Sequence, residues 1–254
     1  SPLVSGISFI GSTNIGKHLF RQAAGALKRV LLELGGNAPF IVFESGDIAE
    51  AVEGAIISKF RNSGQTCVSS NRFYMQACLY DTFVAQLKAE VEALKIGAGH
   101  EEGMRIGPLI NAAQLKRVEA FMKDARQRNA KVLCDGKRLK DKGPLFNAPD
   151  IITDYYNYAG KFETEDDVVC RVNKTLHGLA AYFYSQNVQQ VFRVARRLEV
   201  GMVGVNVGLM SQAEAPFGGI KESSIGRDGS HHDIDEFTEW EYICLGGLKY
   251  NEHD

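Results

Sequence analysis

The chain has 254 residues, of which 44% are hydrophobic and 24% charged, and its formal net charge at pH 7 is −2. A chain of this length can bury a large core in one domain or two. The near-neutral charge, without a basic run, argues against a nucleic-acid or membrane-surface partner, and no apolar segment approaches the roughly 18 residues needed to cross a bilayer.

The N-terminal third predicts alternating strands and helices. A strand over residues 4–10 ends in a turn at Gly11, a helix covers residues 14–26, and a second strand covers residues 29–34. Strand, helix and strand imply a parallel crossover, and ligands collect at the C-terminal ends of such strands. Gly11 and Glu33 both fall at strand ends, so we expect them to line the same crevice.

The rest of the chain continues the alternation and predicts an α/β fold. The helix over residues 48–60 begins at Asp47, which is a good cap because Glu50 follows three positions later. Further helices are expected over residues 81–96, 114–128 and 188–198 and from Thr164 onward; strands are expected over residues 40–43, 73–76, 131–133, 151–153, 179–184 and 202–207. The alternating tail over residues 239–245 predicts an edge strand.

The cysteines and histidines predict neither a disulfide framework nor a metal site. The five cysteines are odd in number and contain no C-x-x-C pair, which favours a reducing compartment. His231 and His232 are adjacent but lack nearby ligands at metal spacing, so we expect them to be surface residues.

Two residues carry the chemistry of a nucleophile and a base. Cys67 follows a glycine turn and has a cation, Arg61, six positions ahead; a neighbouring cation lowers a thiol pKa and favours the reactive thiolate. Glu33 ends an apolar run, and a carboxyl in a partly apolar site has the raised pKa of a general base. Taken singly, a cysteine such as Cys67 is most often a small buried hydrophobe, and a glutamate such as Glu33 is more often a solvated strand-end residue.

Four motifs together resemble the aldehyde dehydrogenase superfamily. The paired signature is Glu33-Leu34-Gly35-Gly36 followed by Gly64-Gln65-Thr66-Cys67. A cofactor-side loop, Gly11-Ser12-Thr13-Asn14-Ile15-Gly16, precedes it, and a C-terminal signature, Pro216-Phe217-Gly218-Gly219-Ile220-Lys221, follows it. Their order and spacing match the family over nearly the whole chain.

The resemblance implies a site and a reaction. Cys67 would be the nucleophile and Glu33 the base that hydrolyses a thioester, while Gly11, Ser12, Gly16, Leu34 and Gly35 would bind the cofactor, NAD or NADP, with NAD favoured. No metal is implied.

Arg61 and Ser211 match the positions that bind the distal carboxylate in succinate-semialdehyde dehydrogenases, which implies a carboxylated aldehyde as substrate. A guanidinium fork both orients and selects a carboxylate. Without the resemblance, Arg61 would be interpreted as a cation at a helix C-terminus.

The resemblance also implies an organisation, a location and a mode of assembly. Residues 1–36 would be a remnant of the dinucleotide-binding domain, residues 37–221 the catalytic domain, and residues 222–254 a bridging segment with an oligomerisation tail. The tail strand would join copies into a homo-oligomer. Animal-type members are mitochondrial, and a cytoplasmic location is the alternative.

Three departures from the family pattern support a second hypothesis about the function. The family's N-terminal half is absent, and Ala159-Gly160-Lys161 stands where members carry a Glu-x-Phe-Gly-Pro segment that holds the nicotinamide ribose. Ser69 stands where some members have a second cysteine. We therefore expect little or no NAD binding by these residues alone, and the alternative function is a catalytically inactive truncated variant that acts only by subunit association.

Overall fold

The computed structural model describes residues 1–134, 136–155 and 160–247. The helices are α1 (Thr13–Ala24), α2 (Ile48–Phe60), α3 (Tyr80–Glu92), α4 (Ala112–Gln127), α5 (Glu165–Asn173) and α6 (Val188–Arg197), with short 3₁₀ turns η1 (Arg61–Gly64), η2 (Ala77–Leu79) and η4 (Asp233–Glu236). The strands are β1 (Gly6–Ile10), β2 (Arg29–Glu33), β3 (Ala38–Val42), β4 (Ser70–Gln76), β5 (Lys131–Cys134), β6 (Ile151–Thr153), β7 (Gly160–Phe162), β8 (His177–Gly178), β9 (Ala180–Tyr184), β10 (Met202–Val205), β11 (Ile220–Lys221) and β12 (Ser224–Ile225).

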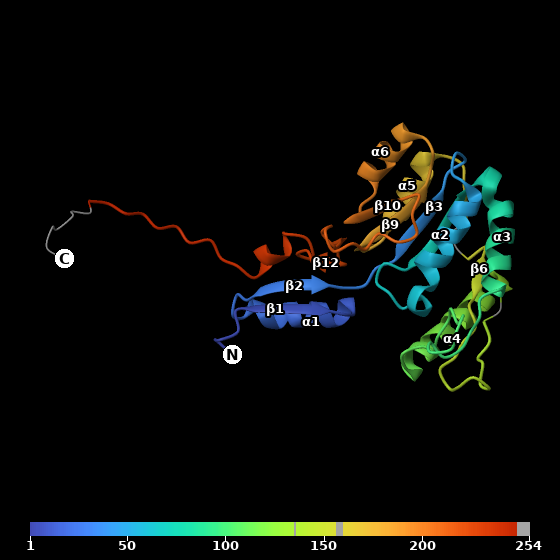
Figure 1. Cartoon of the computed structure of the whole chain (residues 1–254), viewed down its shortest axis with the longest axis horizontal. Coiled ribbons are helices and arrows are strands. Elements are labelled where there is room, and N and C mark those ends of the chain that lie inside the picture. The colour runs from blue at the N-terminus through green and yellow to red at the C-terminus, as the bar shows by residue number, and fades with distance from the viewer. Residues whose placement is uncertain (135, 156–159, 248–254) are drawn as a thin grey trace.

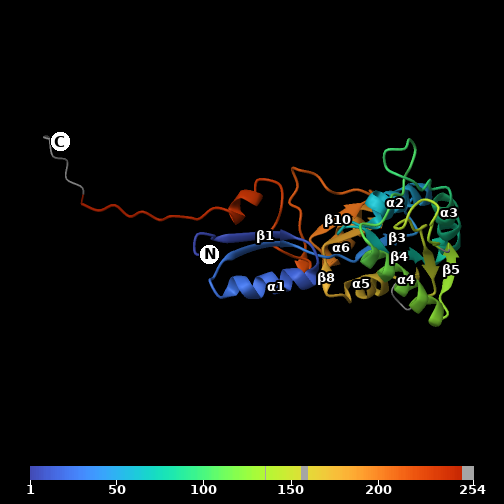
Figure 2. The ribbon, with the colours of Figure 1, turned by 90° about the horizontal axis from the view of Figure 1, so that it is seen from below.

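A five-stranded parallel sheet, in the order β10-β9-β3-β4-β7, forms the larger part of the molecule. Helices cover both faces, α2 and α3 on one and α5 and α6 on the other (Figures 1 and 2). Phe40 and Val42 on β3 pack into the core under α2 and α3, whereas Ile41 and Phe43 pack into the core under α5 and α6. Burial on both faces explains why β3 and β9 are continuous apolar runs.

A smaller three-stranded sheet, in the order β1-β2-β12, lies beside the large sheet (Figure 1). β1 and β2 are parallel and are joined by α1, so the predicted crossover is confirmed. The chain returns near its C-terminal end to add β12, which pairs antiparallel with β2 and sets Ser224 opposite Glu33. This late return places two distant sequence segments next to each other at the end of β2.

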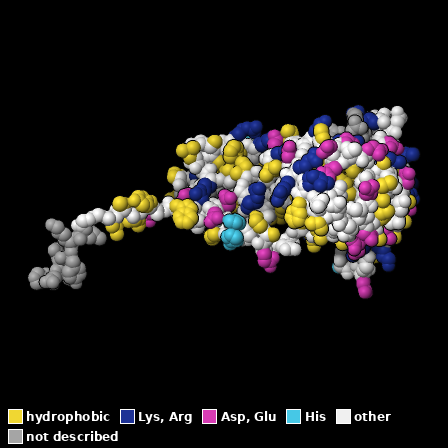
Figure 3. Space-filling view, turned by 90° about the horizontal axis from the view of Figure 1, so that it is seen from above, with side chains coloured by type: hydrophobic (Ala, Val, Ile, Leu, Met, Phe, Trp, Pro, Cys, Tyr) yellow, Lys and Arg dark blue, Asp and Glu magenta, His cyan; other side chains and the backbone are white. Residues whose placement is uncertain are grey.

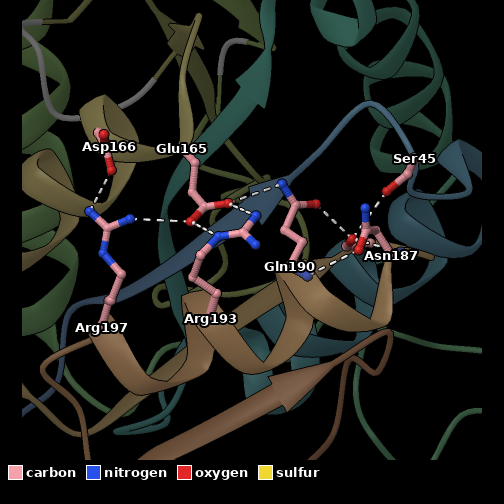
Figure 4. Close-up of polar contacts among 8 residues, drawn as sticks. Ser45, Glu165, Asp166, Asn187, Gln190, Arg193 and Arg197 are labelled. Atoms are coloured by element: carbon pink, nitrogen blue, oxygen red, sulfur yellow. Dashed lines mark hydrogen bonds and ion pairs between the residues drawn. The ribbon is translucent and has the colours of Figure 1, made fainter.

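Helices α5 and α6 are joined by a polar network at the start of α5. Glu165 accepts hydrogen bonds from Arg193 at 2.7 and 2.8 Å and from Arg197 at 3.2 Å, and Asp166 pairs with Arg197 at 2.7 Å (Figure 4). These bonds lower the pKa of Glu165, with Arg193 as the main cause. Because both acids also lie in the first turn of α5, where they favour the helix dipole, we assign this network to stability.

The extended tail corrects one prediction. No strand is assigned in the described tail residues 239–247, although their alternating pattern predicted an edge strand. The tail leaves the body (Figure 1), and its hydrophobic side chains, among them Trp240 at 99% exposure and Tyr242 at 88%, face solvent (Figure 3). A strand needs a partner for its backbone groups, and within a single chain this tail meets none.

The shorter segment near Gly160 leaves the large sheet continuous. Residues 156–159 lie outside the described residues, and Gly160–Phe162 forms β7, which pairs with Tyr74, Met75 and Gln76 of β4. Most other predicted elements differ from the structure by a few terminal residues; α2 was predicted with its observed limits, whereas α3 ends at Glu92 rather than at residue 96. No helix in the described part of the chain has the length and apolar character of a membrane span.

Candidate active site

The turn that carries Cys67 has a left-handed backbone. After α2 ends at Phe60, the φ angles of Asn62, Ser63 and Gly64 are 52°, 56° and 75°. This conformation suits glycine, but it costs an ordinary residue roughly 1–2 kcal/mol. The surrounding structure must therefore hold the turn in place.

Residues 107–110 hold this turn by side-chain hydrogen bonds, and we call them the 107–110 clamp. The hydroxyl of Ser63 accepts from the N–H of Gly107 at 2.9 Å and donates to the carbonyl of Gly107 at 3.1 Å. The side chain of Gln65 accepts from the N–H of Ile110 at 2.8 Å and donates to the carbonyl of Pro108 at 3.4 Å. Ser63 and Gln65 thus fix the loop just before the nucleophile.

Cys67 is half-buried, and the pKa of its thiol is raised. Burial is the largest cause, and the nearby Glu33 carboxyl adds to it. The N–H groups of Cys67 and Val68 and the charge of Arg61 act in the opposite direction but do not outweigh burial. The expectation that Arg61 would leave Cys67 with a lowered pKa is therefore wrong in its net sign, because desolvation of the thiolate exceeds the effect of the cation.

Glu33 is a buried carboxyl with one oxygen bonded and one free. Its side chain is 2% exposed, and Oε1 accepts a 2.6 Å hydrogen bond from the Ser224 hydroxyl. Oε2 is buried and has no hydrogen-bond partner among the residues that the structure describes. Burial, the largest cause, raises the pKa of Glu33 to about 7 against the opposing effect of the Ser224 hydrogen bond. This value is close to the optimum for a base that works near neutral pH.

The motifs that carry Glu33 and Cys67 pack directly on each other. A Cβ on Gly36 would lie 2.2 Å from the carbonyl oxygen of Cys67, so this close approach requires glycine. A Cβ on Gly218, in the C-terminal signature, would lie 2.8 Å from Oε1 of Glu33, and φ of Gly218 is 154°. Three of the four motifs therefore meet at the Glu33 carboxyl and the backbone of Cys67.

The residues matched to cofactor binding cluster at the end of the small sheet. The N–H of Gly11 bonds to the carbonyl of Glu33 at 2.9 Å, and Ser12 caps α1 without a side-chain hydrogen bond. A Cβ on Gly16 would lie 2.4 Å from Leu34, and the N–H of Gly35 bonds to the hydroxyl of Thr13 at 3.3 Å. Small residues at a helix N-terminus leave room and N–H donors for an anionic ligand, so this corner fits part of a dinucleotide.

Arg61 lines one hollow, and Ser211 lies between two residues that line another. Arg61 is exposed and lines a groove of about 340 Å³ that begins at the end of α2. Ser211 is exposed in the loop after β10, next to Met210 and Gln212, which line a hollow of about 230 Å³. Among the described residues the side chains of Arg61 and Ser211 form no hydrogen bond to each other. The structure therefore does not by itself join them into one carboxylate-binding site.

Sequence reasoning missed the residues that complete the site from a distance. Ser224 was not recognised as the partner of Glu33, because only the pairing of β12 with β2 brings it there. The 107–110 clamp was interpreted as a turn, for which its Gly-Pro pair is the usual signal, and nothing local indicates contact with a loop more than 40 residues earlier in the chain, as the separation of 44 between Ser63 and Gly107 requires.

Comparison with known proteins identifies the family of the chain. The aldehyde dehydrogenase family model matches residues 1–243. A probable succinate-semialdehyde dehydrogenase [NADP(+)] of Sinorhizobium fredii is 46% identical over 98% of this chain and 53% of its own length. The mitochondrial succinate-semialdehyde dehydrogenase of Rattus norvegicus is 48% identical over 97% of this chain and 50% of its own length.

A solved structure shares the fold. The crystal structure of an NADP-dependent enzyme of E. coli superimposes with a TM-score of 0.93 at 46% identity, covering 97% of this chain and 54% of that one. The chain belongs to the aldehyde dehydrogenase family, as its motifs predicted. It spans about half the length of the relatives it matches, and two of those relatives are named as enzymes of succinate semialdehyde.

Proposed function

We propose that this chain carries the nucleophile and base for the NAD(P)-dependent oxidation of succinate semialdehyde to succinate, a step of GABA degradation. The observation that supports it most directly is the contact between the Glu33 and Cys67 motifs, with a base whose pKa is about 7. The names of the relatives support the substrate.

Cys67 acts first. Its thiolate adds to the aldehyde carbon, and the carbonyl oxygen becomes an alkoxide that can accept a hydrogen bond from the Cys67 N–H. When bound, NAD(P) supplies the hydride acceptor that turns this adduct into a thioester. Because the thiol pKa is raised, formation of the thiolate requires a base. We assign this first proton transfer to the Glu33 carboxylate, which then passes the proton to solvent before it acts on water.

Glu33 acts in the second half of the reaction. The unbonded Oε2 can take a proton from water, and the hydroxide equivalent attacks the thioester carbon. The carbon–sulfur bond then breaks, the acid is released, and the proton returns the sulfur to the thiol. Ser224 is compatible with this role as a base, because its hydroxyl bonds only to Oε1 and leaves Oε2 for water.

The cofactor is a nicotinamide dinucleotide held by Gly11, Ser12, Gly16, Leu34 and Gly35. The sequence favoured NAD, but two of the compared proteins carry NADP in their names, so that preference is not supported. The expectation of little NAD binding by these residues alone stays a prediction. Trp240, 99% exposed in the tail, is a poor reporter of it, and nicotinamide fluorescence is the better measurement.

Further parts of the proposal rest on the resemblance. Arg61 and Ser211 bind the distal carboxylate of the substrate. The chain divides into residues 1–36, 37–221 and 222–254, and the exposed tail pairs with another copy in a homo-oligomer. The name of the rat relative supports a mitochondrial location, with the cytoplasm as the alternative. The inactive-variant alternative is not favoured, because the relatives are named as semialdehyde dehydrogenases and this chain contains both Cys67 and Glu33.

An activated ester tests the nucleophile and base without any hydride acceptor. We expect the chain to hydrolyse p-nitrophenyl acetate through an acetyl group on Cys67, because attack and hydrolysis need only a thiolate and a base. Cys67→Ala should abolish release of p-nitrophenol, and Glu33→Gln should leave the acetyl group on the Cys67 peptide in mass spectrometry. Cys78→Ala, at an exposed cysteine, is the matched control. Unchanged hydrolysis by the Cys67→Ala variant would refute the proposal.

A further inference from the structure

A groove with two arginines opens next to the nucleophile turn. Its volume is about 340 Å³, and apolar side chains form much of its lining, among them Ile56, Phe60, Leu94 and Met104. Arg61, at the end of α2, and Arg105, two residues before the 107–110 clamp, add two guanidinium groups to the same lining. The volume lies in the lower part of the range for small-molecule sites.

The two guanidinium groups have no acidic partner in the part of the chain that the structure describes. Neither Arg61 nor Arg105 forms an ion pair or a side-chain hydrogen bond there, and the backbone N–H of Arg105 is bonded to the carbonyl of Lys95 at 2.9 Å. Two like charges over an apolar surface repel each other and raise the local concentration of anions. The groove therefore has the charge and the lining to hold a short aliphatic chain that ends in a carboxylate.

The groove is fixed relative to the reacting thiol. Arg61 is close enough for its charge to act on both Cys67 and Tyr182. The position of Arg105 is set by the 107–110 clamp, which follows it in the chain. This clamp is hydrogen-bonded to Ser63 and Gln65 of the nucleophile turn. One loop therefore sets the distance between the second arginine and the nucleophile.

We propose that Arg105 is a specificity-determining residue that binds, together with Arg61, the carboxylate at the far end of the aldehyde substrate. The methylene groups lie on the apolar lining, and the aldehyde end extends beyond the groove toward Cys67, which is not among the lining residues. Two guanidinium groups can satisfy both oxygens of one carboxylate, which selects acid-bearing over neutral aldehydes. This inference rests on the proposed function, since it assumes that Cys67 is the attacking group.

Alkylation of Cys67 tests the inference without turnover. Iodoacetate and iodoacetamide are similar in size and differ in charge, so the ratio of their rates at Cys67 reports the local positive potential. The ratio is read from the Cys67 peptide by mass spectrometry, because exposed cysteines also react. We expect Arg105→Ala and Arg61→Ala each to lower the iodoacetate preference about 2- to 5-fold, as for single exposed charges, and about 1 M salt to remove it.

Matched variants separate charge from folding. Arg196→Ala removes one arginine from the last turn of α6, outside the groove, and should leave the ratio unchanged. Arg105→Lys keeps the charge and should retain most of the preference. Succinate should protect Cys67 from iodoacetamide, and Arg105→Ala should raise the concentration needed by a similar factor.

Three outcomes decide between the inference and the function on which it rests. A lowered ratio in both Arg61→Ala and Arg105→Ala supports the inference. A lowered ratio in Arg61→Ala alone, with Cys67 fully reactive, overturns the role of Arg105 and leaves the proposed function intact. If neither reagent alkylates Cys67 in the folded chain, both the proposed function and the inference fail.

Discussion

The two sheets of this molecule differ in how completely they are covered. Every residue of β3 and β9 is buried, whereas β1 alternates between exposed and half-buried residues, with Ile10 at 70% exposure. Helix α1 buries only Gly16 and Ala23. The large sheet therefore has its own core, while the small sheet gains less from burial. Glu33 lies on the small sheet and Cys67 follows a helix of the large one, so the site joins a well-packed part to a poorly packed part.

The largest expected difference between the sheets comes from core truncation. Phe183→Ala in β9 removes a fully buried ring that packs edge-on against Phe43, and should destabilise the fold by about 3–5 kcal/mol. Ile10→Ala in β1 should change stability by less than about 0.5 kcal/mol, because the side chain is mostly exposed. Urea unfolding followed by circular dichroism measures both. Similar losses for the two variants would mean that the sheets are packed alike.

The second effect concerns the buried carboxyl and pH. The pKa of Glu33 is 4.5 in an ordinary setting and about 7 in the fold, so between these values the unfolded chain has lost a proton that the folded chain keeps. Stability therefore falls as the pH rises through this window, by up to about 3 kcal/mol. Glu33→Gln removes the titration while keeping an acceptor for Ser224.

Unfolding curves for the wild type and Glu33→Gln at about pH 4 and about pH 8 measure this effect. The variant should be more stable by roughly that amount at the higher pH, and the two should agree at the lower pH. Glu44→Gln, at an exposed glutamate, serves as the control. An equal difference at both pH values would show that Glu33 does not carry the shifted pKa.

The smallest effect compares two helix caps. In α2 the Asp47 side chain accepts a 3.0 Å hydrogen bond from the N–H of Glu50, so Asp47→Ala should cost about 1 kcal/mol. In α1 Ser12 occupies the cap but makes no such bond, so Ser12→Ala should change stability little. Thermal unfolding of the two variants measures the difference, and a larger loss for Ser12→Ala would contradict the observed cap geometry.

The sequence was most informative where local chemistry decides the structure. Asp47 and the apolar stripe after it define α2, and the run before Glu33 defines β2, so both elements were predicted. The cofactor-side turn and the nucleophile loop followed from motifs. Long-range pairing could not be predicted from local sequence. Ser224 reaches Glu33 only through β12, and the tail pattern predicted a strand that the described residues 239–247 do not form.

The direction in which the pKa of the Cys67 thiol shifts could not be predicted from the sequence either. A cation near Cys67 is visible in the sequence, but the burial that outweighs it depends on how two sheets meet. The sequence can therefore identify charged groups that shift the pKa of a side chain, but it cannot show whether burial has the larger effect.

The left-handed turn before Cys67 also constrains the order in which the molecule assembles. Its conformation is unfavourable for Asn62 and Ser63 until Gly107 supplies hydrogen-bond partners, and that residue is 44 positions beyond Ser63. Contacts of such separation close late in folding, after helices have already formed. The loop before the reactive cysteine therefore reaches its observed geometry only after residues 107–110 have docked on it.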